Sequence, residues 1–82
     1  MKATIHITLK AGVLDPQGKA IETALHRLGF AQVIQARQGK LIEIDLDESD
    51  ATTARATLKD MCEQMLANTV IEDYEITLHN DK

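Results

Sequence analysis

The chain has 82 residues, of which 44% are hydrophobic and 27% charged, a balance typical of one folded domain and too apolar for a disordered segment. A formal net charge of −4 and only two aromatic residues, Phe30 and Tyr74, argue against nucleic-acid binding, which needs cations at the phosphates and aromatic stacking. The single cysteine, Cys62, excludes an intramolecular disulfide, and no apolar run approaches the roughly 20 residues that span a bilayer. We therefore expect one domain over residues 1–82, located in the cytoplasm.

The first two predicted elements are a strand and a helix. Residues 3–9 alternate between apolar and polar side chains, which indicates a half-buried strand. Asp15 is a good helix N-cap and Pro16 suits the first helical position. An apolar stripe then leads to Gly29, where a left-handed residue would end the helix and let Phe30 fold back on Leu25. The predicted helix spans residues 16–28.

The rest of the chain continues as strand, strand, helix and strand. Residues 30–36 predict a second strand, and a tight turn at Gln38–Gly39 would join it to a third over residues 40–47. Ser49 or Asp50 would cap a second helix, which Asn68 would end in a left-handed conformation. A last strand is predicted from about residue 70 to 78, with a frayed tail over 79–82.

This β-α-β-β-α-β order predicts an α+β fold. Two helices with one apolar stripe each would cover one face of a four-stranded antiparallel sheet, a ferredoxin-like two-layer sandwich. The polar sheet face, or a strand edge, would remain for a second copy of the chain. A domain of this size has a thin core, so self-association as a dimer or a tetramer would help to stabilise it.

The sequence shows no catalytic or metal-binding constellation. His6, His26 and His79 lie on three different elements, and Cys62 lies on an apolar helical stripe, where cysteine is more often a buried hydrophobe than a nucleophile. The carboxylates cluster on solvated strand ends, which favours a solubilising surface over acid–base chemistry. The GVLDPQG segment, residues 12–18, matches neither phosphate-loop pattern. We expect no catalytic residue, metal or cofactor on this chain.

The unusual feature is the segment over residues 10–19. Val13 and Leu14 are apolar in a connection that should be polar, and Gly18 occupies a helical position where glycine costs about 1 kcal/mol relative to alanine. One interpretation is a capped connection whose two apolar residues tuck under the sheet edge. The other is a docking element for a partner protein, in which Gly12 and Gly18 permit close backbone approach. Arg37 and Lys40 are either solvated hairpin charges or contacts to an anionic partner.

At these motifs the sequence resembles the PurS subunit family of phosphoribosylformylglycinamidine synthase. The resemblance rests on residues 10–21, which contain GVLDPQG, and on the RQGK segment at residues 37–40. It implies a non-catalytic subunit of a ligase that makes formylglycinamidine ribonucleotide from formylglycinamide ribonucleotide, glutamine and ATP. It also implies homodimers that bridge a PurQ glutaminase, which releases ammonia, and a PurL synthetase, which uses ATP and Mg²⁺.

The residues of the family motif are our candidate partner contacts. Those expected to meet a partner are the following: Gly12, Val13, Leu14, Asp15, Gln17, Gly18, Arg37 and Lys40. The alternative function is an ACT-like regulatory domain, which shares the element order and binds small molecules at dimer interfaces. A stand-alone enzyme lacks a plausible base or nucleophile here.

Overall fold

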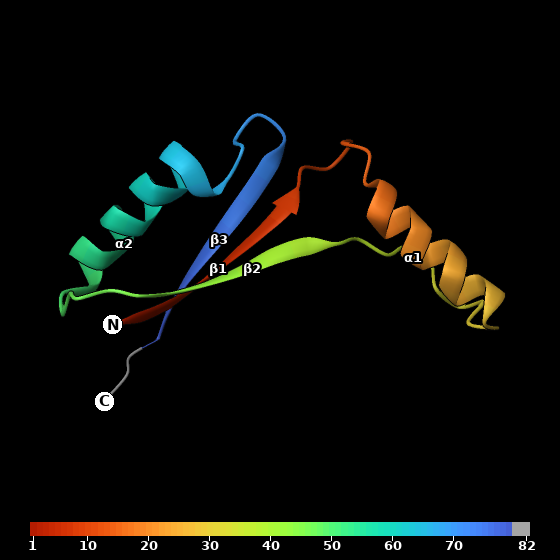
Figure 1. The fold of residues 1–82 in the computed structure, drawn as a ribbon, viewed down its shortest axis with the longest axis horizontal. Coiled ribbons are helices and arrows are strands. Elements are labelled where there is room, and N and C mark those ends of the chain that lie inside the picture. The colour runs from red at the N-terminus through yellow and green to blue at the C-terminus, as the bar shows by residue number, and fades with distance from the viewer. Residues whose placement is uncertain (80–82) are drawn as a thin grey trace.

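A computed structural model describes residues 1–79, which form two α-helices and three strands (Figure 1). In chain order they are β1 (Lys2–Leu9), α1 (Pro16–Arg27), β2 (Gly39–Asp45), α2 (Ala51–Met61) and β3 (Glu72–His79). One π-helical turn, Cys62–Leu66, extends α2. The first and last strands and both helices lie close to their predicted ranges.

The sheet is antiparallel, in the order β2-β1-β3. Ile5 in the middle of β1 lies opposite Ile42 of β2 and Ile76 of β3. Ala3, Ile5 and Ile7 are buried on the inner face, whereas the outer face carries polar side chains. This alternation is the period-two pattern of the sequence.

The expected fourth strand is absent from the described residues, so the prediction of a four-stranded sheet is wrong for this chain. Residues 31–32 form a turn, and 33–38 have no strand pairing. Val33 instead lies against α1, where its carbonyl oxygen is 2.7 Å from His26 Nε2. The predicted Gln38–Gly39 turn is also wrong, because Gly39 opens β2 opposite Thr8 and does not have a positive φ.

Helix α2 supplies the other half of the core. The Asp50 carboxylate accepts hydrogen bonds from Thr53 N–H and Oγ1–H, which selects Asp50 over Ser49 as the N-cap. Ala54, Leu58 and Cys62 are fully buried against the sheet. The helix ends in the π turn and not at a left-handed Asn68, because no non-glycine residue in the described part of the chain has a positive φ.

Helix α1 begins and ends as local signals predict. Asp15 is its N-cap and Pro16 its first residue. At the other end Gly29 has a φ of +100°, and the N–H groups of Gly29 and Phe30 donate to the carbonyls of His26 and Leu25. This pair of bonds is a Schellman ending, as the glycine predicted.

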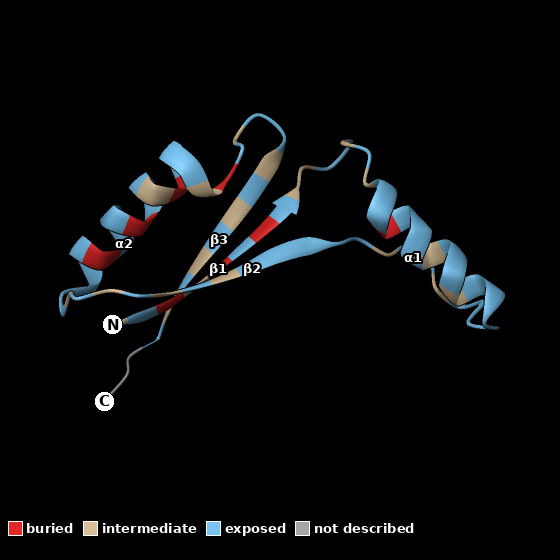
Figure 2. Ribbon diagram, viewed as in Figure 1, coloured by how far each residue is buried: buried red, intermediate tan, exposed pale blue. Residues whose placement is uncertain are grey.

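The position of α1 differs from the expected two-layer sandwich. Figure 1 shows α1 projecting beyond the end of the sheet instead of covering its face beside α2. The radius of gyration is 16.1 Å, against about 12 Å for a compact domain of this length. Gly18 is the only buried residue of α1 (Figure 2). We call residues 11–38, which comprise α1 and its flanking segments, the α1 arm.

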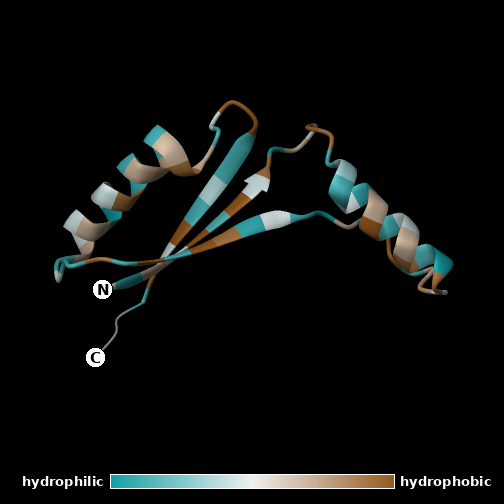
Figure 3. Cartoon of the chain, in the orientation of Figure 1, coloured by the Kyte–Doolittle hydropathy of each residue, from teal (hydrophilic) through white to brown (hydrophobic). Residues whose placement is uncertain are grey.

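The α1 arm carries several hydrophobic residues (Figure 3), and a number of them are exposed. Leu28 is 73% exposed and Ile34 is 93% exposed. Leu14, Ile21 and Phe30 are exposed as well. The apolar stripe that predicted an amphipathic helix is present, but this chain does not cover it.

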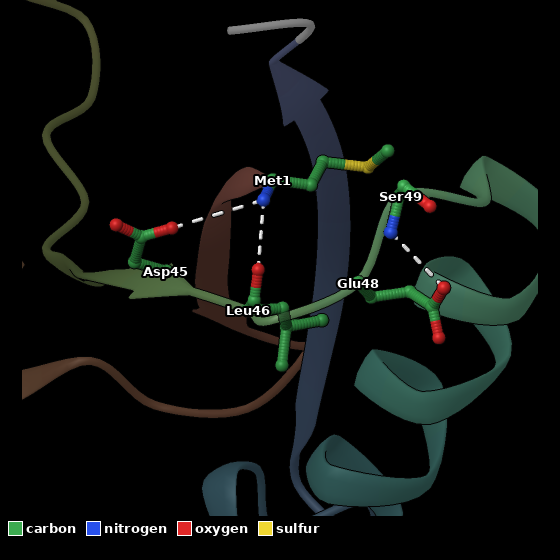
Figure 4. A network of polar contacts seen from close by, with 5 residues as sticks. All are labelled: Met1, Asp45, Leu46, Glu48 and Ser49. Carbon is green, nitrogen blue, oxygen red and sulfur yellow. Dashed lines mark hydrogen bonds and ion pairs between the residues drawn. The ribbon is translucent and has the colours of Figure 1, made fainter.

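The opposite end of the sheet is tied to the start of the chain (Figure 4). The amino group of Met1 donates to the carbonyl of Leu46 at 2.7 Å and lies 3.8 Å from an Asp45 carboxylate oxygen. Glu48 accepts from the backbone N–H of Ser49 in the connection to α2. The predicted tail begins at His79, which belongs to β3 and contacts Thr4 Oγ1 at 2.6 Å; residues 80–82 lie outside the described part of the chain.

Candidate functional site

The candidate residues gather where the α1 arm joins the sheet. Two segments meet there, residues 9–18 leaving β1 and residues 36–39 returning to β2, and we call them the neck. A turn opens the first segment, with Val13 N–H donating to the Lys10 carbonyl at 3.0 Å. Gly12 has a φ of +87° in this turn, and a Cβ there would have open space around it. Within the described part of this chain, Gly12 therefore serves the turn conformation, and no other segment approaches it closely.

The Asp15 carboxylate joins the two segments. One oxygen accepts from the N–H of Gly18 at 2.9 Å, which caps α1, and the other accepts from the N–H of Gln38 at 2.8 Å. The hydrogen bond from Gln38, then that from Gly18, holds the pKa of Asp15 below its usual value, and the positive charge of Arg37 acts in the same direction. The charged form of Asp15 is the one that this geometry stabilises.

Gly18 lies directly against the returning segment. A Cβ at this position would be 2.5 Å from the carbonyl oxygen of Ala36 and 2.9 Å from the Cα of Arg37. Both neighbours are backbone atoms and cannot rotate away. The sequence indicated that something packs against this glycine, and the structure shows that the neighbour is the chain itself.

Arg37 closes the neck from the other side. Its Nη2 donates to the carbonyl of Leu9 at 2.8 Å and to that of Lys10 at 3.3 Å. The guanidinium thereby satisfies carbonyls at the end of β1, where strand pairing stops. Arg37 is not at a hairpin tip, contrary to the prediction, because the hairpin does not form.

Lys40 links the neck to the start of β3. Its Nζ lies 3.4 Å from the Glu72 carboxylate, which also accepts from the N–H of Asn68. The Asn68 hydrogen bond, more than the charge of Lys40, holds the pKa of Glu72 below its usual value. Lys10 N–H donates to the carbonyl of Ile71, so the neck also rests on the segment before β3.

The remaining candidates present groups to solvent. Leu14 is 77% exposed, Val13 is half-buried, and Gln17 is exposed on the first turn of α1. Two depressions of about 270 and 260 Å³ flank the neck, and Asp15 contributes to both. The first contains Lys40 and Gln17, and the second contains Val13, Leu14 and Arg37.

The neck has no arrangement suited to bond-making chemistry. Cys62 lies away from it in the core, where burial raises the pKa of the thiol. Among residues 1–79 no group of three or more histidine, cysteine or acidic side chains is placed to hold a metal ion. No helix within the same residues is long and apolar enough to cross a membrane. What the geometry supplies is a hydrogen-bonded junction with exposed apolar side chains beside it.

Comparison with known proteins matches this architecture. The family model for PurS, described as phosphoribosylformylglycinamidine (FGAM) synthase, matches residues 2–80. The chain belongs to the PurS family. The PurS subunit of Synechocystis sp. is 51% identical over 75 residues, covering 89% of this chain and 75% of the relative. The PurS subunit of Bacillus subtilis is 45% identical over 73 residues, covering 89% of this chain and 86% of the relative.

Solved PurS structures share the fold. The crystal structure of Methanocaldococcus jannaschii PurS, one of the subunits of formylglycinamide ribonucleotide amidotransferase, superimposes with a TM-score of 0.90 at 41% identity and covers 99% of this chain and 98% of that one. A chain in the structure of PurLQS from Thermotoga maritima superimposes with a TM-score of 0.85 at 32% identity, covering 93% of each. The PurS match confirms the resemblance and does not favour a small-molecule sensor.

Sequence reasoning missed three residues in or next to the neck. Gln38 and Ala36 contribute only backbone atoms, which have no residue-type signal. Glu72 is far from Lys40 in the sequence, and only the register of the sheet brings them together. Of the eight expected partner contacts, the side chains of Asp15, Arg37 and Lys40 have partners within the chain.

Proposed function

We propose that this chain is the small, non-catalytic subunit of FGAM synthase in de novo purine biosynthesis. The observation that carries the proposal is the PurS family match over residues 2–80. A similar chain in a PurLQS structure supports a role within a complex. The reaction converts formylglycinamide ribonucleotide, glutamine and ATP into formylglycinamidine ribonucleotide in the cytoplasm.

In this proposal the chain bridges two catalytic partners. A PurQ glutaminase releases ammonia, and a PurL synthetase binds ATP and Mg²⁺ and uses the ammonia. The chain itself binds no cofactor and supports the transfer by holding the two partners together. The neck favours this role because the Asp15 carboxylate and the Arg37 guanidinium are engaged by backbone groups of the chain itself.

The partner-binding surface is proposed to centre on Val13 and Leu14. Leu14 is 77% exposed, and both of its chain neighbours are hydrogen-bonded: Val13 N–H donates to the Lys10 carbonyl, and the Asp15 carboxylate caps α1. An apolar side chain between two anchored residues loses less conformational entropy on binding than one on a free loop, which suits a docking residue. Gly12, Gln17 and the exposed face of Lys40 would form the rim.

A second copy of the chain is proposed to cover the α1 arm. A 12-residue helix is marginal in water without tertiary packing, and the contacts seen for α1 are with its own return segment, at Ala36 and Val33. Leu28 and Ile34 are among the most exposed apolar residues of the chain, on the same arm. Assembly with a second copy of the same chain would bury both side chains without the need for a different protein.

Co-purification tests the docking surface. The double variant Val13→Asp with Leu14→Asp should retain the far-UV circular dichroism of the wild type and fail to co-elute with PurL and PurQ. The charges would enter the contact unpaired, and burying them is costly. Co-elution of the folded double variant with both partners would contradict the docking surface.

A matched control adds the same charges elsewhere. Met65 and Val70 are 80% and 81% exposed apolar residues outside the neck and the α1 arm. The double variant Met65→Asp with Val70→Asp should co-elute with both partners. Equal loss in the two double variants would assign the effect to added negative charge and not to Val13 and Leu14.

A further inference from the structure

The direction of the α1 arm is set by very few contacts. The arm leaves and rejoins the sheet only through the neck, and α1 does not rest on the sheet face (Figure 1). A helix attached by two flexible segments would sample many directions. Within a single chain, the contacts that fix the arm relative to the sheet therefore lie at the neck.

The hydrogen bonds of the neck connect the end of β1 to the start of α1 in a continuous series. Arg37 binds the end of β1 through the Leu9 and Lys10 carbonyls, and its neighbour Gln38 donates to the Asp15 carboxylate. Asp15 in turn caps α1 through Gly18. The path thus runs from β1 through the returning segment to the start of α1, and each link is an ionised side chain bonded to backbone, the stronger kind of hydrogen bond.

Close packing of the backbone restricts the movement of α1 further. Gly18 allows the first turn of α1 to lie against Ala36 and Arg37 closer than any other residue would. With the two segments in contact and Asp15 bridging them, α1 cannot pivot without breaking a hydrogen bond. The returning segment is also held farther along, where Val33 contacts His26.

We infer that Asp15 and Arg37 are positioning residues, which fix the direction of the α1 arm relative to the sheet so that the arm and the Val13–Leu14 surface meet their partners in one geometry. The inference rests on the proposed function, because it assigns to the motif an action within the chain and not a direct contact with PurL or PurQ. It revises the expectation that all eight motif residues touch a partner.

Pulsed electron spin resonance between two labels measures the arm direction. Cysteines replacing Arg27, at the end of α1, and Glu75, on the outer face of β3, would carry the labels; both positions are exposed. Cys62 is fully buried and should stay unlabelled in the folded chain. An excess of unlabelled chain restricts the signal to distances within one molecule.

The doubly labelled chain should give a narrow distance distribution. Asp15→Ala and Arg37→Ala should each broaden it by at least twofold, while Cys62 remains unreactive and reports an intact core. Lys19→Ala removes an ion pair of α1 with Glu22 outside the path, and should leave the distribution narrow. Narrow distributions in both neck variants would overturn the inference.

A pair of conservative variants lowers the risk of unfolding and distinguishes positioning of the arm from direct contact with a partner. Asp15→Asn keeps one acceptor oxygen but points amide hydrogens at one of the two N–H donors, and Arg37→Lys keeps the positive charge but replaces the planar guanidinium with an ammonium group on a shorter side chain. Both should broaden the distribution less than the alanine variants and weaken co-elution with PurL and PurQ in the same order. Lost co-elution with a narrow distribution would make these residues direct contacts and overturn positioning. If the unmutated chain fails to bind the partners, the proposed function fails, while the distance measurement still decides positioning.

Discussion

The Asp15 carboxylate accepts a hydrogen bond from the backbone N–H of Gln38 at 2.8 Å, although 23 residues separate them. The same carboxylate caps α1 through the N–H of Gly18. One side chain therefore performs a local task that the sequence reveals and a long-range task that it does not. The predictions below test the consequences of this double role and of the packing around it.

Gly18→Ala should destabilise the chain although alanine favours helices. The new Cβ would lie 2.5 Å from the Ala36 carbonyl oxygen, and overpacking of this kind costs about 1–3 kcal/mol. Helix propensity would offset about 1 kcal/mol of that cost. We expect a net loss of up to about 2 kcal/mol in the free energy of unfolding by urea at fixed protein concentration.

Thr23→Ala provides the matched control for Gly18→Ala. Thr23 is exposed on the same helix, so its replacement should change the free energy of unfolding by no more than about 0.5 kcal/mol, in the stabilising direction. If Gly18→Ala were as stable as Thr23→Ala, the close approach at the neck would be disproved.

Asp15 should make the stability of the chain depend on pH in the acid range. Its pKa is lowered in the folded chain, chiefly by the Gln38 and Gly18 hydrogen bonds. The charged carboxylate therefore contributes stability that is complete above its unfolded pKa of about 3.9 and is lost as the pH falls through the folded value. Urea midpoints of the wild type and Asp15→Asn should differ at neutral pH and converge on acidification.

Asp73→Asn controls for the loss of one negative charge. Asp73 is exposed on β3, and its replacement should leave a curve nearly parallel to that of the wild type. An Asp15→Asn curve that ran parallel to the wild type from neutral to acid pH would contradict the role of the carboxylate at the neck.

Tyr74 should titrate far above an ordinary tyrosine. Its hydroxyl donates to Glu63 at 2.6 Å, and this hydrogen bond, with burial and the carboxylate charge, raises the pKa of Tyr74 to about 12. The protonated phenol contributes stability that is complete below the unfolded pKa of about 10 and is lost as the pH rises through the folded value. The chain has one tyrosine and no tryptophan, so phenolate absorbance reports this group alone.

Glu63→Gln should lower the midpoint of the Tyr74 titration towards about 10. Glu75→Gln, on the exposed side of β3 next to Tyr74, should leave it unchanged. An unchanged midpoint in Glu63→Gln would show that the hydrogen bond does not set the pKa of Tyr74.

Negative charges introduced on the α1 arm should dissociate the homo-oligomer. Leu28→Asp with Ile34→Asp places two carboxylates among the exposed apolar residues of the α1 arm that a second copy is proposed to cover. Light scattering after size exclusion should give a multiple of the chain mass for the wild type and a smaller mass for this variant. Met65→Asp should keep the wild-type mass, and a monomeric wild type would refute the proposal.

Local structure was predictable because its signals are local. The Asp15–Pro16 start and the Gly29 ending of α1 depend on backbone groups within one turn, and the sequence specifies them directly. The β1 strand follows from the alternation that buries Ala3, Ile5 and Ile7. The buried stripe of α2 was likewise readable from its spacing.

The arrangement of those elements was less predictable. Val33 and Ile34 suggested a strand, yet their segment lies against α1 without strand pairing. The apolar stripe of α1 indicates a face to be covered, but periodicity does not say whether the same chain covers it. Arg37 was misplaced for a related reason, because its acceptors are backbone carbonyls 27 and 28 residues away, which no residue type marks.

The measurement that tests the proposed function most directly is reconstituted synthesis of formylglycinamidine ribonucleotide from purified PurL and PurQ, with and without this chain. With glutamine as the nitrogen donor, the rate should fall to background when the chain is omitted and recover when it is added back. With ammonium salt as the donor, PurL should retain activity without the chain. An unchanged glutamine-dependent rate in the absence of the chain would contradict the proposed role.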